Sequence, residues 1–205
     1  MHHNILSDKQ SQLLPFLRKF KKNYYLAGGT AIALHIGHRH SIDFDLFTNS
    51  TINKKKISSE IIKLNTSSQP LFFDIDQQHY IINEVKCTFL HYPYPVEHTG
   101  LFQDVITVPG LLDLAAMKAF ALSRRSKWKD YVDLYFIFKE HYNLQQVMEK
   151  AKQYFPDQIT EKLLRNQLAF HKDIDYKEKV DYVTANPPSD KEIKDFLIEI
   201  ATRPF

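Results

Sequence analysis

Apolar positions recur at helical spacing after Ser7, which predicts a helix over residues 8 to 22 with Ser7 as its N-cap. Pro15 lies inside this stretch and predicts irregular first turns, because proline lacks the N–H that a helix interior uses. Tyr24 to Ala27 is a short apolar run, and the two glycines after it end a predicted strand. The chain is therefore expected to open with a helix that leads into a strand.

Alternation of apolar and acidic residues, followed by Phe47, predicts a second strand over residues 42 to 47. Between the two strands, Thr30 is the expected N-cap of a short helix that ends at His38. Alternate residues of a strand point to opposite faces. The two predicted faces are Ile42, Phe44 and Leu46 on one side, and Asp43, Asp45 and Phe47 on the other.

The pattern changes from strands to helices near residue 108. The expected elements are a helix over residues 53 to 64, strands over 71 to 76, 80 to 83 and 85 to 91, and helices over 109 to 125 and 128 to 140. From Asn143 onward the pattern is helical throughout, with a break at Asn186-Pro187-Pro188 and a cap at Ser189. The predicted fold class is α+β, with a small mixed sheet and flanking helices in residues 1–108 and an all-α region in residues 109–205.

The composition is that of a globular protein, with 43% hydrophobic and 13% aromatic residues in a chain of 205. No apolar run approaches the roughly 18 residues that span a bilayer, and residues 1–10 show no secretory signal pattern. The single cysteine, Cys87, cannot form an internal disulfide, which fits a reducing compartment. These features predict a cytoplasmic protein with no membrane partner.

Positive charge is concentrated in two segments. Residues 1–60 carry nine Lys/Arg and four Asp/Glu, and residues 111–150 carry seven and five. Two separated basic segments can converge on one phosphate-bearing ligand. Solvated helix faces are the other explanation, and charge alone favours that one.

The acidic pair Asp43 and Asp45 is the first candidate for chemistry. Residues i and i+2 of a strand project from one face, about 7 Å apart along the backbone. Carboxylates at this separation suit one or two Mg²⁺ ions. An acidic, outward-facing strand surface is the alternative, but the apolar neighbours of this pair favour a partner or a metal.

The glycine pair Gly28-Gly29, between the first strand and the helix, is the second candidate. Glycine permits close approach of the backbone, and a helix that starts at Thr30 points free N–H groups at an anion. For the two glycines alone, a plain tight turn is the favoured explanation. The combination of a phosphate-type loop with a carboxylate pair on adjacent strands is what indicates an active site.

Lys118 is the third candidate, because it is the only charge in residues 114 to 122. An ammonium group among small apolar residues either reaches toward an anion or extends along the surface to solvent. In the next predicted helix, Asp130 and Asp133 share a face at i and i+3. Asp133 is the expected partner of Lys118, in either a structural salt bridge or a catalytic arrangement.

Three blocks of sequence, in this order, resemble the AbiEii/AbiGii-type toxin nucleotidyltransferases of the polymerase-β-like nucleotidyltransferase superfamily. The first block is Gly28-Gly29-Thr30 through Arg39 and Ser41 to Asp43-Phe44-Asp45-Leu46-Phe47. The second is Val85-Lys86 through Tyr92-Pro93-Tyr94-Pro95. The third joins Asp113 through Lys118 to Lys129-Asp130-Tyr131-Val132-Asp133-Leu134.

The resemblance implies metal-dependent transfer of a nucleoside monophosphate from an NTP, with Mg²⁺ or Mn²⁺, to an RNA acceptor such as a tRNA 3′ end. It also implies a toxin that is paired with a separate antitoxin protein. By position, Asp43 and Asp45 would hold the metal, and Lys118, Asp130 and Asp133 would complete the catalytic cleft. The nucleotide would contact Gly28, Gly29, Thr30, Arg39, Ser41, Lys118 and Lys129.

One departure concerns the third carboxylate that some superfamily members take from a later strand. The matching position here is Thr88, and Glu84, Asp74 or Asp76 could replace it only in a different register. Thr88 cannot carry the charge that a second metal needs. Two alternatives are therefore kept, a catalytically inactive nucleotide- or RNA-binding module with the same cleft, and NMP transfer to a protein hydroxyl.

Overall fold

The computed structural model describes residues 1–204 and divides the chain into two compact units, Met1–Gly110 and a second that begins at Leu111. The strands of the first unit form one mixed sheet in the order β3-β4-β5-β2-β1-β7-β6, which confirms the predicted fold class. The elements of this unit are η1 (His3–Ile5), α1 (Asp8–Arg18), β1 (Tyr25–Ala27), α2 (Gly28–Ile36), β2 (Asp43–Thr48), α3 (Lys54–Lys63), β3 (Ser68–Phe73), β4 (Gln77–Ile82), β5 (Val85–His91), β6 (Gly100–Phe102) and β7 (Ile106–Val108).

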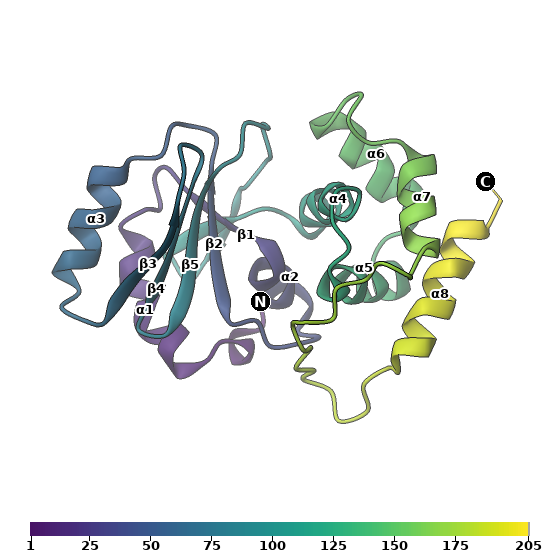
Figure 1. The fold of residues 1–205 in the computed structure, drawn as a ribbon, viewed down its shortest axis with the longest axis horizontal. Helices are drawn as coiled ribbons and strands as arrows, with labels where there is room; N and C mark the ends of the chain where they lie inside the picture. The colour runs from purple at the N-terminus through teal and green to yellow at the C-terminus, as the bar shows by residue number, and fades with distance from the viewer. Residues whose placement is uncertain (205) are drawn as a thin grey trace. The chain divides into compact units, whose positions relative to one another are not determined.

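Strand β2 lies between β5, with which it pairs in parallel, and β1, with which it pairs antiparallel. Phe44 and Leu46 are completely buried, whereas Asp43 and Asp45 on the opposite face are half-buried. On the apolar face, the ring of Phe89 packs against aromatic side chains of α1 and the turn that follows it. Figure 1 shows α1 and α3 on this side of the sheet. The face that carries Asp43 and Asp45 is called the Asp face below.

Several predicted boundaries are wrong for local reasons. Helix α1 is continuous from Asp8 despite Pro15, because Ser7 and Gln10 form a capping box that satisfies the first free N–H groups. Helix α2 begins at Gly28, so Thr30 lies within the helix and is not its cap. Ile42 precedes β2 and is 64% exposed, so it does not join the apolar face.

The strands outside the centre of the sheet were predicted less well. Strands β3 and β4 each begin three residues before their predicted starts, and β6 and β7 were not predicted. Strands of three residues are too short to show an alternation of their own, and they form here by pairing with β1 and with each other.

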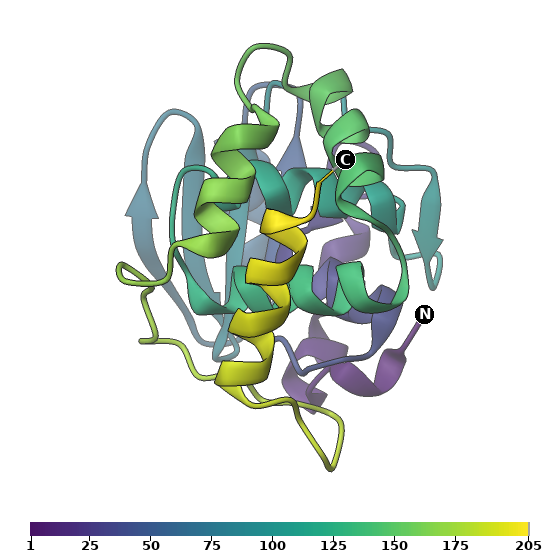
Figure 2. The same ribbon diagram turned by 90° about the vertical axis from the view of Figure 1, so that its right-hand side faces the viewer.

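In the described residues of the second unit, all of the regular elements are helices. They are α4 (Leu111–Leu122), α5 (Trp128–Glu140), α6 (Leu144–Tyr154), α7 (Glu161–Ala169) and α8 (Asp190–Thr202). Helix α4 lies against α5 and α6, and α8 lies against α5 and α7 (Figure 2). No helix in the described residues is long and apolar enough to cross a bilayer.

The expectation that the chain is helical throughout after Asn143 is wrong for residues 170–189. This segment is mostly polar and exposed, and it has no apolar stripe that a helix could bury. Its backbone is bonded elsewhere. The Trp128 N–H donates to the Asp175 carbonyl at 3.0 Å, and the Asp175 N–H donates to the Ser126 carbonyl at 2.7 Å.

Candidate active site

The backbone at the start of α2 lies directly against the acidic pair. Gly28 has a φ of +70°, and a Cβ placed on it would lie 2.2 Å from Asp45 Oδ2. Only glycine fits both the left-handed conformation and this close approach. The N-cap residue, Ala27, offers no side-chain acceptor to the first turn. The unit therefore brings the free N–H groups of a helix N-terminus and a strand carboxylate together, as the sequence combination suggested.

Three other predicted nucleotide contacts are buried beneath this loop. Thr30, Arg39 and Ser41 are each less than 10% exposed. Thr30 Oγ1 lies 2.9 Å from Ser41 Oγ and also donates to the carbonyl oxygen of Asp43, so it ties α2 to β2. A Cβ on Gly29 would lie 2.3 Å from Arg39 Nη2, so the second glycine makes room for this guanidinium group. These side chains hold the loop in place, and their direct contact with a nucleotide stays a prediction.

Replacing Gly28 by alanine is expected to lower activity more than its effect on stability explains. The left-handed conformation costs a non-glycine residue about 1–2 kcal/mol, and the new methyl group displaces the Asp45 carboxylate. Gly37→Ala is the matched control, because Gly37 has a φ of +67° but a Cβ there would meet the movable His2 ring. Transfer rates and thermal unfolding of both variants check this. Equal activity in the two variants would contradict a functional role for the Gly28–Asp45 contact.

The register of β2 and β5 decides the question of a third carboxylate. Asp43 pairs with Lys86, and Asp45 pairs with Thr88. Thr88 is therefore the nearest β5 neighbour of Asp45 on the Asp face, in the position that the sequence identified. No group of three His, Cys, Asp or Glu side chains that could hold a metal is present among residues 1–204.

The acidic residues that could have replaced Thr88 lie elsewhere. Glu84 forms a salt bridge with Lys9, and Asp76 Oδ1 lies 3.0 Å from His91 Nδ1. Asp74 accepts a hydrogen bond from the Ile75 N–H in the β3–β4 turn. In the observed β2–β5 register, these three acidic residues therefore do not join Asp43 and Asp45.

The charges of the two β2 carboxylates act on a side chain of the adjacent strand β5. Burial raises the pKa of the neighbouring Cys87 thiol, and the charges of Asp45 and Asp43 raise it further. Mg²⁺ is usually held by one or two carboxylates, with waters and substrate phosphates as its other ligands. The donor set present therefore fits one such ion bound together with a triphosphate, and it lacks the third protein carboxylate of a two-metal site.

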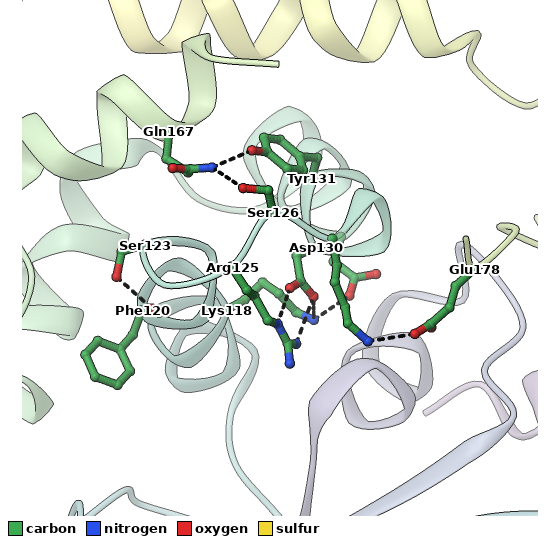
Figure 3. Close-up of polar contacts among 11 residues, drawn as sticks. Lys118, Phe120, Ser123, Arg125, Ser126, Asp130, Tyr131, Gln167 and Glu178 are labelled. Carbon is green, nitrogen blue, oxygen red and sulfur yellow. Dashed lines mark hydrogen bonds and ion pairs between the residues drawn. The ribbon is translucent and has the colours of Figure 1, made fainter. Parts of the chain in front are cut away.

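Three of the predicted polar residues of the second unit, Lys118, Asp130 and Asp133, form one buried cluster (Figure 3). Lys118 Nζ lies 2.7 Å from Asp130 Oδ1 and 3.0 Å from Asp133 Oδ2. All three side chains are at most 6% exposed. The expected pairing of Lys118 with Asp133 is confirmed, and Asp130 joins the same ammonium group.

Arg125 completes this cluster and was missed by the sequence analysis. Its Nε donates to Asp130 Oδ2 at 2.8 Å, and its Nη2 donates to Oδ1 at 3.3 Å. Burial alone would raise the pKa of Asp130, but Lys118 and Arg125 outweigh it and hold the pKa below its usual range. The available signal was a basic residue five positions before Asp130, in the short connection between α4 and α5.

Lys129, the other predicted phosphate ligand, is engaged by a carboxylate of segment 170–189. Its Nζ lies 3.3 Å from Glu178 Oε2, and Lys127 Nζ lies 2.7 Å from Glu178 Oε1. Hydrogen bonding to Lys127, helped by Lys129 and opposed by burial, lowers the pKa of Glu178 to about 2. This pairing therefore stabilises the fold above about pH 4.5 and is lost as the pH falls toward 2.

Comparison with known proteins agrees with the fold. MenT4, a nucleotidyltransferase toxin from Mycobacterium tuberculosis H37Rv, is similar with a TM-score of 0.63 and 13% identity, over 95% of this chain and 81% of that chain. JHP933 from Helicobacter pylori is similar with a TM-score of 0.55 and 17% identity, over 96% and 91%. At these identities the likeness concerns the fold alone.

Similarity in sequence supplies the family. An uncharacterized protein of Aquifex aeolicus (strain VF5) is 37% identical over 123 residues, which are 58% of this chain and 59% of that protein. A family model described as "Nucleotidyl transferase AbiEii toxin, Type IV TA system" matches residues 16–95 and 92–202. Because this model matches nearly the whole sequence, the chain belongs to the AbiEii family of nucleotidyl transferase toxins, as the three sequence blocks suggested.

Proposed function

We propose that this protein transfers a nucleoside monophosphate from an NTP to a hydroxyl group of an RNA, with a tRNA 3′ end as the preferred acceptor. The main support for this proposal is the close approach of Gly28 to Asp45, by which a helix N-terminus lies beside a carboxylate pair. A helix N-terminus binds phosphate groups, and a carboxylate pair binds a divalent cation.

Asp43 and Asp45 would hold the ion, Mg²⁺ or Mn²⁺. When bound, the ion supplies charge neutralisation for the triphosphate and polarises an oxygen ligand. The N–H groups of Gly28, Gly29 and Thr30 would bind the phosphate oxygens. The buried hydrogen bonds beneath the loop keep those donors fixed, so little reorganisation is required during the reaction.

The second unit is proposed to take part through Lys118 and Lys129, which would contact phosphates. Asp130 and Asp133 would orient the Lys118 ammonium group, since both carboxylates bond to it. Lys129 must exchange its contact with Glu178 for a phosphate. That exchange costs little, because the Glu178 side chain is 48% exposed and salt bridges of such groups are weak.

The biological role that we propose is that of the toxin of a toxin–antitoxin pair, acting in the cytoplasm. Family membership supports this proposal, since the family description names both a toxin and a toxin–antitoxin system. The partner would be a separate antitoxin protein.

The direct test incubates the protein with each labelled NTP and total RNA, in Mg²⁺, in Mn²⁺ and in excess chelator. We expect label in an RNA band with one or two of the nucleotides, and none with chelator. Label that survives chelation would contradict the role of Asp43 and Asp45 as metal ligands. Label that enters a protein would identify a protein hydroxyl as the acceptor.

A catalytically inactive nucleotide-binding module is the second candidate, and Thr88 beside Asp45 is the observation that favours it. Such a module would bind an NTP in an equilibrium titration but release no pyrophosphate with any RNA or protein acceptor. Pyrophosphate release that depends on an acceptor would exclude it.

A further inference from the structure

A row of side chains crosses the Asp face from β2 to the sheet edge. Asp45 pairs with Thr88, Thr88 with His79, and His79 with Phe72. Residues directly opposite one another in adjacent strands point to the same face, with Cβ atoms about 5 Å apart. Thr88 is therefore the direct neighbour of Asp45, and His79 stands one strand further away, with the Phe72 ring on its far side at 5.7 Å between centroids.

The contacts of His79 fix which of its ring nitrogens carries the proton. Nε2 lies 3.1 Å from Gln77 Oε1, an amide oxygen that can only accept a hydrogen bond. In the neutral imidazole, Nε2 is therefore the donor and Nδ1 the acceptor. Nδ1 lies 3.3 Å from Thr88 Oγ1, so the Thr88 hydroxyl donates to the histidine and keeps its own lone pairs for another donor.

The surroundings keep His79 neutral. Burial lowers the pKa of His79 below the usual 6.5 of an imidazole, and the charge of Lys86 lowers it further. Lys86 lies on β5, the carboxylates of Asp43 and Asp45 lie beyond it on β2, and β3 places only Phe72 opposite His79. At neutral pH the imidazole is thus an available proton acceptor.

We propose that Thr88 and His79 together accept the proton of the attacking RNA hydroxyl, in place of a third carboxylate. This inference rests on the proposed transfer reaction. The hydroxyl oxygen forms a bond to the α-phosphorus, and the bond from that phosphorus to the bridging oxygen breaks to release pyrophosphate. The hydroxyl proton passes to Thr88 Oγ1 as the Thr88 proton passes to His79 Nδ1, and the imidazolium then loses it to solvent.

The first test uses variants that remove one part of the relay. Thr88→Val keeps the shape of the side chain but has no hydroxyl, and His79→Ala removes the acceptor. Each is expected to lower kcat about 10²- to 10⁴-fold, the usual contribution of general base catalysis, while the KM for the NTP changes little. His91→Ala is the matched control, since His91 is a half-buried histidine of β5 that bonds to Asp76 instead.

The second test restores a base at the same position. Thr88→Asp in the His79→Ala background places a carboxylate beside Asp45, and it should recover a large part of the lost kcat. The acid limb of the kcat profile should also change, from that of a histidine whose pKa is lowered by burial to that of an aspartate, at about 4. A purely structural role for His79 would give neither the rescue nor the moved pH profile.

A further measurement does not depend on activity. The ¹⁵N chemical shifts of the neutral His79 ring should show a protonated Nε2 and an unprotonated Nδ1. A protonated Nδ1, or wild-type kcat in both Thr88→Val and His79→Ala, would overturn the relay alone. A wild-type protein that transfers no NMP to any acceptor would overturn the proposed function and the relay together.

Discussion

Asp45→Asn is expected to lower the rate of NMP transfer by at least about 10³-fold. A bound metal ion contributes several kcal/mol of charge stabilisation to a transition state, and each 1.4 kcal/mol corresponds to about a factor of ten. Asparagine has nearly the same shape, so it keeps the packing against Gly28 while it removes the charge that attracts the ion.

The stability of this variant is expected to change in the opposite sense. Asp43 and Asp45 are like charges on one face of β2, so removing one of them relieves repulsion in the folded protein. The free energy of unfolding should therefore stay the same or rise without metal. Loss of activity together with unchanged or increased stability is typical of a ligand-binding carboxylate, and it separates this role from a structural one.

Acceptor-dependent release of pyrophosphate, measured together with thermal unfolding, checks both parts of this prediction. Asp104→Asn serves as the control, because Asp104 is an exposed carboxylate of the same unit that pairs with Arg18 and Lys21. It should retain wild-type activity. An Asp45→Asn variant with full activity would rule out the proposed metal site.

Lys118→Met is expected to lower the free energy of unfolding by about 3–5 kcal/mol, the usual cost of removing one partner from a buried ion pair. Methionine fills most of the space of the lysine stem, so lost packing contributes little. Arg125 still pairs with Asp130, but Asp133 is 0% exposed and loses the ammonium group that lies 3.0 Å away. The midpoint of thermal unfolding should fall by roughly 10 °C or more.

A double-mutant cycle identifies the cause of this loss. Asp133→Asn in the Lys118→Met background removes a buried charge that has lost its Lys118 contact, and it should recover part of the lost stability. Lys191→Met is the surface control, because Lys191 pairs with Asp195 at the exposed surface of α8 and should contribute at most about 1 kcal/mol. Equal unfolding free energies for Lys118→Met and Lys191→Met would contradict the buried cluster.

The cluster also has a pH dependence with a defined sign. The pKa of Asp130 is lower in the folded protein than its ordinary value near 3.9, because Lys118 and Arg125 outweigh burial. The stability from this group is therefore present above that ordinary value and is lost as the pH falls through the folded pKa. The activity of a Lys118 variant is best compared with that of the wild type near neutral pH, at a temperature where the variant and the wild type are both folded.

Local patterns were enough to predict the centre of the first unit. Alternation in residues 42 to 47 placed Asp43 and Asp45 on one face, because the side-chain period of a strand is two whatever its partners are. The helical stripes of the second unit, and the three blocks that resemble the AbiEii family, were read in the same way. These features depend on residues that are close together in the sequence.

The remaining features depend on pairing between distant parts of the chain. Lys118 reaches both Asp130 and Asp133 because α4 packs beside α5. Thr30, Arg39 and Ser41 are buried because α2 folds back over β2. A sequence shows which side chains are polar but not which of them will lose contact with solvent. Burial of these three side chains was therefore not predicted, and their direct contact with a nucleotide stays a prediction.

The sequence by itself determined the family, the order of the elements from α1 to β5, and the shared face of the acidic pair. Tertiary structure decided which side chains lie beside Asp43 and Asp45. A one-residue change in the β2–β5 register would turn Thr88 to the other face, and the observed register places it between Asp45 and His79. Register follows from how neighbouring strands such as β2, β4 and β5 bury their apolar residues at once, and no single segment of the sequence contains that information.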